Sequence, residues 1–140
     1  MSAGSMTKAE REAFLAGVHI GVLSVDEPGR GPMSLPIWYL VDGDEIVISI
    51  AAGSLKARLI EAAGRATMTI QSEEPPYYKY ASIEGPARLV PAAHDRLELA
   101  ARYLGPELGQ RYVDSTPSEG SVDVRLRPEH WRTHDYAKSL

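Results

Sequence analysis

The sequence predicts a mainly β protein, a small closed or split β-barrel flanked by helices. Short segments rich in β-branched residues recur along the chain and are bounded by Gly, Pro and Asp turns. Helical patterns stand at the start, once between strands in the middle, and as a pair before the last strand. Antiparallel strands with helices inserted between them are typical of such barrels.

The first elements follow from capping and turn signals. Thr7 and Glu10 have capping-box spacing, which predicts a helix over residues 8–15. Strands are expected over residues 18–25 and 33–41, with a turn cluster between them. Because proline removes a ladder donor, Pro36 indicates an edge, a bulge or an opening in the sheet.

The middle of the chain predicts a hairpin followed by a helix. Asp42-Gly43-Asp44 supplies the positive φ of a tight turn, and residues 45–50 return as the antiparallel partner. Ser54 is the expected N-cap of a helix that runs to about residue 63. Gly64 is expected to end this helix as its C′ residue.

The chain after Gly64 predicts three strands and a helix pair. The expected strands cover residues 66–70, 78–90 with a bulge at Gly85-Pro86, and 121–127, which residues 128–135 extend past a bend. The expected helices cover residues 92–103 and 106–113, with Pro106 at N1, and a polar loop follows at 114–120. The whole set amounts to about six strands dominated by hairpins.

Composition limits the class of protein. We interpret residues 1–5, which precede a second methionine, as a cloning remnant and residues 6–140 as a single domain. The net charge of -4 argues against a nucleic-acid binder. The absence of cysteine excludes disulfides and thiolate metal sites and fits a cytoplasmic protein. No apolar run is long enough to span a membrane, and no signal-peptide pattern is present.

The strand–turn–helix stretch over residues 48–58 is the main candidate site. It breaks at Gly53 and restarts at Ser54, and Lys56 and Arg58 then lie in the first helical turn. Free amides at a helix N-terminus carry partial positive charge, which disfavours cations there. An anion, most simply a phosphate, would reverse that preference. The alternative is that both side chains bend to water or pair with acids such as Glu61.

Other chemistry-bearing residues point to structural roles. The four histidines are His19, His94, His130 and His134, and the sequence locates no third ligand for the last pair, so no metal site is expected. Trp131 fits either barrel packing or a substrate wall, packing being the more frequent role. The run Tyr77-Tyr78-Lys79-Tyr80 follows Glu73-Glu74, which argues against a nucleic-acid stacking strip and favours a dimer interface, where tyrosine is enriched.

Five short segments, taken in order, resemble the pyridoxamine 5′-phosphate oxidase-like split β-barrels, which bind FMN or the deazaflavin coenzyme F420. The resemblance covers roughly residues 15–88 and the terminal strand. It is carried by Gly21-Val22-Leu23-Ser24, Pro32-Met33-Ser34-Leu35-Pro36-Ile37-Trp38-Tyr39, Ser54-Leu55-Lys56-Ala57-Arg58-Leu59, Ile83-Glu84-Gly85-Pro86-Ala87 and Pro128-Glu129-His130-Trp131-Arg132-Thr133. The branch that it most resembles is the deazaflavin/flavin oxidoreductase group of actinobacterial type.

The resemblance implies a set of cofactor-binding residues. Lys56 and Arg58 would bind the cofactor phosphate, assisted by Ser54 and the helix N-terminus. Ser49, Ile50 and Ala51 would lie along the phosphate and ribityl chain, and the backbone of Pro36, Ile37 and Trp38 would meet the tricyclic ring. The family forms two-fold dimers with the ring at the interface, so Tyr77, Tyr78, Lys79 and Tyr80 of the partner would complete the pocket.

The resemblance also implies a function. We expect a homodimeric oxidoreductase that passes hydride from reduced coenzyme F420 to a small unsaturated or quinone-like acceptor. The alternatives are an FMN-binding split-barrel protein, a non-catalytic flavin or deazaflavin binder, and a haem-handling relative. Because the cofactor performs hydride chemistry, the absence of a recognisable protein nucleophile or catalytic triad agrees with this expectation.

Overall fold

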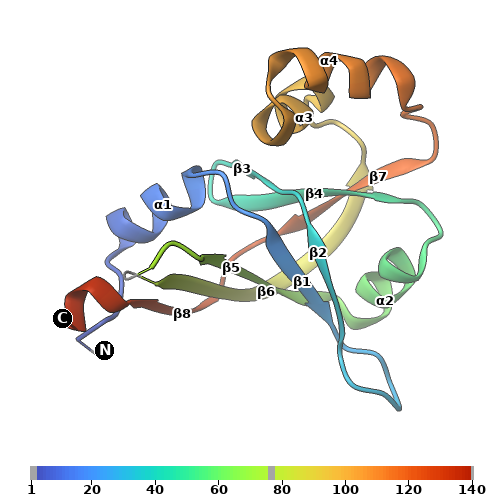
Figure 1. The fold of residues 1–140 in the computed structure, drawn as a ribbon. Helices are drawn as coiled ribbons and strands as arrows, with labels where there is room; N and C mark the ends of the chain where they lie inside the picture. Colours follow the sequence, from blue (N-terminus) through green and yellow to red (C-terminus); the bar gives the residue numbers. More distant parts are fainter. Residues whose placement is uncertain (1–2, 76–77, 140) are drawn as a thin grey trace.

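The computed structural model describes residues 3–75 and 78–139, which form a curled antiparallel sheet with four α-helices (Figure 1). The helices are α1 (Lys8–Ala16), α2 (Leu55–Ala63), α3 (Arg96–Leu104) and α4 (Pro106–Ser115), followed at the end by the 3₁₀ turn η1 (Tyr136–Ser139). The strands are β1 (Gly21–Val25), β2 (Met33–Ile37), β3 (Leu40–Asp42), β4 (Glu45–Ala51), β5 (Arg65–Ser72), β6 (Lys79–Pro91), β7 (Ser121–Leu126) and β8 (His130–Asp135).

The strand order explains why the sheet curls. It runs β2-β1-β5-β6-β7-β4-β3, and β8 also pairs with β6. The two end strands, β2 and β3, are consecutive in the chain and separated by Trp38 and Tyr39. A short link between the two ends of one sheet requires that sheet to bend round on itself, so the predicted split β-barrel is confirmed.

The concave side of the sheet holds the main core. Residues alternate between the two sides of a strand, and β5 buries Ala66, Met68 and Ile70 in this way. The same alternation in β4 turns Ile46, Ile48 and Ile50 inward and leaves Val47, Ser49 and Ala51 on the opposite side. That opposite side is important below, because α3 covers part of it through contact of Leu99 with Val47.

The long strand β6 changes neighbours along one of its edges. Residues 79–84 of β6 pair with β8 and residues 87–91 pair with β7. Between these pairings, residues 127–129 lie opposite only Gly85 and Pro86, so the extra residue belongs to the β7–β8 side. The sequence therefore predicted the place of the bulge, but the wrong strand, and β8 is the expected continuation of β7 past a bend.

Gly85 is required at this point by a close backbone approach. A Cβ added there would collide with the carbonyl oxygen of Arg127. The amides of Arg127 and Glu129 donate to the carbonyls of Pro86 and Glu84, which fixes the two strands against each other. No side chain can be accommodated without separating these backbones.

Several local predictions are confirmed. Thr7 and Glu10 form the capping box of α1, and the Ser54 hydroxyl accepts from the Ala57 amide at the start of α2. Gly64 has φ 68° and ends α2 in the left-handed conformation. Pro36 lies in β2, at an end of the strand order, which is the edge position that a proline indicates.

Two strand predictions are too long. The strand expected from residue 18 begins at Gly21, because the carbonyls of Gly17 and His19 accept from Arg102 and Tyr103 instead. The strand expected over residues 33–41 splits into β2 and β3. At this break the amide of Tyr39 donates to the Tyr103 hydroxyl at 3.1 Å, which takes it out of the ladder.

The helix expected from residue 92 begins at Arg96. Asp95 is its N-cap and accepts from the Glu98 amide. The amides of Ala93 and His94 both donate to the carboxylate of Asp123, so this segment is fixed to β7 rather than coiled into the helix.

The N-terminal residues that the sequence analysis leaves outside the domain do contact it. The amide of Asp135 donates to the Gly4 carbonyl at 2.7 Å, and Lys138 donates to the Ser5 carbonyl. Across the described ranges, no helix has the length and apolar character needed to cross a membrane.

We predict that Gly85→Ala destabilises the fold by at least about 3 kcal/mol, because the new methyl group must displace backbone. Gly31→Ala is the matched control, since a Cβ at Gly31 meets nothing within 4 Å. Urea unfolding of both variants measures the difference. Equal unfolding free energies for the two variants would show that the strands at Gly85 separate without cost.

Candidate functional site

The turn from β4 into α2 has the donor arrangement that an anion requires. Gly53 has φ 74°, a left-handed conformation that allows the chain to leave β4 and enter α2 within three residues. The hydroxyl of Ser54 caps Ala57, while the first turn of α2 contains no acidic residue. The remaining free amides at this helix end therefore keep an uncompensated partial positive charge.

Lys56 and Arg58 add full charges at the same place. Arg58 is exposed and its Nη1 donates back to the Gly53 carbonyl at 3.2 Å, which holds the guanidinium beside the turn. Lys56 is half-buried and has no hydrogen-bond or ion-pair partner among the described residues. Within the same ranges, neither side chain pairs with Glu61, which was one half of the alternative, whereas Arg58 is exposed to water, which was the other half. The residues present thus fit a phosphate.

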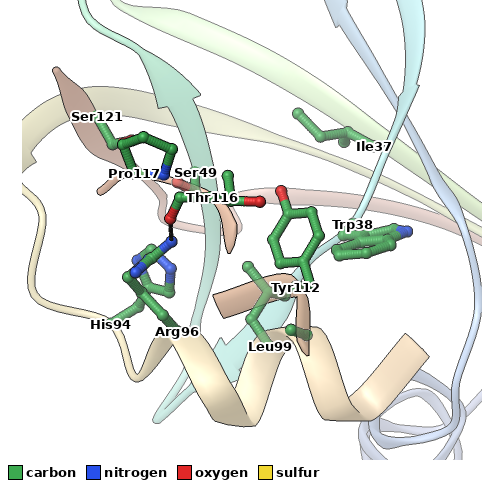
Figure 2. A pocket seen from close by; sticks show the side chains of 11 residues that line it. Ile37, Trp38, Ser49, His94, Arg96, Leu99, Tyr112, Thr116, Pro117 and Ser121 are labelled. Atoms are coloured by element: carbon green, nitrogen blue, oxygen red, sulfur yellow. Dashed lines mark hydrogen bonds between the residues drawn. The ribbon is translucent and has the colours of Figure 1, made fainter. Parts of the chain in front are cut away.

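A pocket beside this turn contains three of the residues expected to contact the cofactor. Ile37 from the end of β2, Trp38 and Ser49 from β4 line one cavity of about 250 Å³ (Figure 2). The segment before α3, the helix pair α3–α4, the loop after it and the start of β7 supply the other walls, which are His94, Arg96, Leu99, Ala100, Tyr112, Thr116, Pro117 and Ser121. The pocket lies on the convex side of the sheet, under the helix pair.

The pocket and the α2 turn are connected through the backbone. Ala51 at the end of β4 pairs with Ser121, which lines the pocket. The next amide, that of Ala52, donates to the Gly120 carbonyl at 2.7 Å. The loop that closes the pocket is therefore hydrogen-bonded to the chain that leads into Ser54.

Strand alternation separates the remaining expected residues. Ile50 is 6% exposed and its side chain faces the core, so at this position only the backbone is placed to lie along a cofactor chain. Ala51 is exposed at the turn. Pro36 is exposed on β2 and does not line the pocket, in contrast to Ile37.

Aromatic stacking attaches the helix pair to the barrel. The rings of Trp38 and Tyr103 are nearly parallel, with centroids 4.9 Å apart. The ring of Tyr112 from α4 also contacts Trp38, at an interplanar angle of 56°. The Tyr103 hydroxyl accepts from the Tyr39 amide and donates to the His19 carbonyl at 2.8 Å. Trp38 is thereby fixed as a wall of the pocket rather than free in solvent.

Arg102, which precedes Tyr103 in α3, strengthens this attachment. Its guanidinium donates to the carbonyls of Leu15, Ala16 and Gly17 and lies 5.0 Å from the centre of the Tyr39 ring. Burial raises the pKa of Tyr39 to about 12, so its hydroxyl stays protonated and donates to Leu15. These bonds hold α3 against the C-terminal end of α1 and Gly17, which follows it.

Sequence reasoning missed a buried His–Asp pair beside the pocket. His94 Nδ1 lies 2.6 Å from Asp123 Oδ1, and the side chains are 7% and 1% exposed. Asp123 is on β7 directly opposite Ser49 of β4, on the side of the sheet that faces the helix pair. In the sequence this aspartate belongs to the alternating polar face of a strand, a pattern that indicates solvent exposure.

The tyrosine-rich segment over residues 78–80 does not line the pocket at Trp38. Lys79 lines a larger cavity of about 570 Å³ between α1 and the start of β6, and its Nζ is 3.9 Å from Asp135. Tyr78 is 52% exposed, and Tyr80 packs its ring near His134. Tyr77 lies outside the described residues. The chain thus does not bring its own Tyr78, Lys79 and Tyr80 to the pocket at Trp38.

The larger cavity suits a phosphate poorly. Glu10, Glu74 and Asp135 are among its lining residues, and carboxylates repel an anion. Burial lowers the pKa of His19, which also lines it, so this imidazole adds little positive charge at neutral pH. Size alone therefore does not make it the better candidate.

The other side chains considered from sequence have structural surroundings. Trp131 packs against the main core, with the Arg11 guanidinium 4.4 Å from its ring centre, which confirms a packing role. His134 contacts the ring of Tyr136. Within residues 3–75 and 78–139, no group of three or more His, Cys, Asp or Glu side chains is arranged to hold a metal ion.

Comparison with known proteins agrees with this fold. The family model for pyridoxamine 5′-phosphate oxidase matches residues 7–135. A search of curated protein sequences gave no significant match.

Solved structures extend the likeness. A conserved hypothetical protein from Mycobacterium tuberculosis has a TM-score of 0.82 at 24% identity, covering 99% of this chain and 91% of that one. An F420 reductase has a TM-score of 0.63 at 25% identity, covering 86% and 94%. An FAD and heme binding protein from Mycobacterium smegmatis has a TM-score of 0.70 at 17% identity, covering 95% and 73%. Since the family match extends over nearly the whole chain and the strand order forms the same split barrel, the protein belongs to the pyridoxamine 5′-phosphate oxidase family.

Proposed function

We propose that this protein is a coenzyme F420-dependent oxidoreductase that reduces a small unsaturated or quinone-like acceptor. The observation that carries the proposal is the juxtaposition of two features. The N-terminus of α2 presents Lys56, Arg58 and free amides without a carboxylate. The turn before it is hydrogen-bonded through the Ala52 amide to Gly120, which precedes Ser121 of the pocket walled by Trp38. A bound deazaflavin would supply the hydride, and the protein would supply the phosphate anchor and an aromatic wall.

Residues of this chain would divide the binding between them. Lys56 and Arg58 would contact the phosphate, with Ser54 holding the helix end in shape. Ser49 and Ala51 would lie along the linking chain, and Ile37 and Trp38 would meet the ring. The likeness to an F420 reductase supports the choice of deazaflavin.

FMN is the main alternative cofactor, because it shares the ring, ribityl chain and phosphate that these residues would contact. A non-catalytic binder is the alternative from a different functional class. A heme storage protein from Vibrio cholerae has a similar structure, with a TM-score of 0.66 at 14% identity, and storage is a role that needs binding alone.

We predict that coenzyme F420 binds more tightly than FMN, and that its affinity falls more steeply with salt. The lactyl-oligoglutamate tail adds negative charges beyond the phosphate, and added salt screens exposed charges. Calorimetry with both cofactors at two ionic strengths measures this. If the two affinities are equal, or if FMN co-purifies at full occupancy, the cofactor of this protein is FMN rather than the deazaflavin.

We predict that Lys56→Ala weakens cofactor binding by about 1.5–3 kcal/mol, the range for a charged hydrogen bond to phosphate. Lys8→Ala is the matched control, because Lys8 is exposed on α1 and pairs with Glu12. Fluorescence quenching gives both dissociation constants. If the folded Lys56 variant binds as tightly as the control, the anion site lies elsewhere.

We predict a homodimer that brings Tyr78, Lys79 and Tyr80 of one chain to the ring contacts of the other. The unpaired edge of β2, with Leu35 39% exposed, and the 52% exposed Tyr78 are the surfaces that support it. Sedimentation should give twice the chain mass. Leu35→Arg should dissociate the dimer, and Leu108→Arg on α4 should not. A monomer at micromolar concentration would refute this arrangement.

A further inference from the structure

The pocket under the helix pair has a polar side that the proposed cofactor contacts leave without a role. Figure 2 shows His94 and Arg96 together on this side, with Trp38 and Ile37 on the other. The aromatic side is the one that would meet the cofactor ring. Of the described residues that line the pocket, none is an aspartate or a glutamate.

His94 presents a hydrogen-bond acceptor. Asp123 Oδ2 accepts from the amides of Ala93 and His94, and Asp123 Oδ1 lies 2.6 Å from Nδ1 of the imidazole. Because a carboxylate oxygen accepts, the neutral imidazole carries its proton on Nδ1 and donates it to Asp123. Nε2 is then an acceptor that solvent can reach and that has no hydrogen-bond partner among the described residues.

Arg96 presents donors on the same side of the pocket. Its Nη2 donates to the Thr116 carbonyl, which holds the guanidinium against the loop that closes the pocket. No other described residue bonds to this guanidinium, whose five N–H hydrogens form a planar fork. The polar side therefore offers several donors and one acceptor.

This combination is complementary to the edge of a cyclic imide. An imide edge has one N–H donor between two carbonyl acceptors, so it requires an acceptor with donors nearby. A carboxylate has acceptors only and would face the Nε2 lone pair of His94. The edge of a haem likewise offers no N–H donor. The lining thus favours a flat ring with an imide at one end.

We propose that His94 and Arg96 bind the imide edge of the cofactor ring, with His94 Nε2 accepting from the imide N–H and Arg96 donating to a carbonyl oxygen. Deazaflavin and flavin rings both have this edge at one end, so the contact would orient that end toward α3 and the opposite end toward Trp38. The cavity of about 250 Å³ is smaller than pockets that enclose a whole cofactor, and it suits one end of the ring. The inference rests on the proposed cofactor function and adds an orientation to it.

Two probes that differ by one methyl group test the contact without any substitution in the protein. One is 8-hydroxy-5-deazariboflavin, which is coenzyme F420 without its phosphate and tail, and the other is its N3-methyl derivative, in which a methyl group replaces the imide hydrogen. We expect the N3-methyl probe to bind at least about tenfold more weakly, because it lacks the donor to Nε2. Fluorescence quenching gives both dissociation constants. Equal affinities, or no binding of the unmethylated probe by a protein that binds coenzyme F420, would overturn the proposal.

A substitution at His94 assigns this discrimination to its Nε2. In His94→Asn the shorter amide can still donate to Asp123 but does not reach the imide, so the affinity ratio of the two probes should fall to within about twofold. His130→Asn on β8 is the control, because His130 is exposed and its loss should leave the wild-type ratio. A folded His94→Asn variant that keeps the full ratio would contradict the assignment.

Arg96→Gln should give a different result from His94→Asn. Both probes keep the carbonyl that Arg96 would contact, so this substitution should weaken both by about tenfold and leave their ratio unchanged. Arg30→Gln in the turn between β1 and β2 is the matched control, because Arg30 is exposed. Unchanged affinities in folded Arg96→Gln would overturn the contact with the carbonyl.

A last titration separates this inference from the proposed function. Coenzyme F420 should displace the unmethylated probe, because both would place the same ring in the pocket. Binding of F420 without displacement of the probe would refute the imide contact alone. A protein that binds neither F420 nor FMN would refute the proposed function and the inference that rests on it.

Discussion

The carboxylate of Asp123 has no exposure to solvent, and the position of the helix pair follows from how its charge is satisfied. It accepts from two amides and the imidazole of the segment before α3, which fixes that segment to β7. A buried carboxylate without such donors would be costly, so the segment has little freedom to move away. At the other end of α3, Arg102 and Tyr103 bond to carbonyls at the end of α1 and in the segment between α1 and β1. Helix α3 is thus fixed at both ends, and the space that the helix pair leaves above β4 and β7 is the pocket.

This arrangement places the candidate site on the convex side of the barrel rather than inside it. The concave side is filled by close-packed aliphatic residues of β1, β4, β5 and β6. On the convex side, Val47 packs on Leu99 while Ser49 and Asp123, the next outward residues, are polar. The outward face of β4 therefore changes from a packing position at Val47 to a pocket-lining position at Ser49 within one alternation. Because Ala52 bonds to Gly120, the loop that closes the pocket and the turn that presents Lys56 are part of one hydrogen-bonded unit.

Local signals in the sequence predicted most of the fold. Capping residues, Gly64 and the edge proline Pro36 act on neighbouring backbone atoms. The helix ends and the edge strand that they determine can therefore be predicted from the sequence alone. Long-range hydrogen bonds explain the errors. Tyr103 ends a strand at Tyr39, 64 residues away, and Asp123 delays a helix by binding amides 29 and 30 residues away. The site was predictable where a helix end collects cations, as at Lys56 and Arg58. Asp123 and His94 were missed because an outward-facing strand position carries no local sign that a helix will cover it.

The account's central claim is that cofactor binding centres on the β4–α2 turn and the adjoining pocket. Chemical-shift mapping of the backbone amides during titration with coenzyme F420 tests it most directly, because it compares the β4–α2 turn, the pocket and the larger cavity in one experiment. The account predicts the largest shifts at Ser49, Gly53–Arg58 and Ile37–Trp38, with smaller ones at Ser121. Shifts confined to Phe14, His19 and their neighbours around the larger cavity, with the β4–α2 turn unchanged, would contradict it.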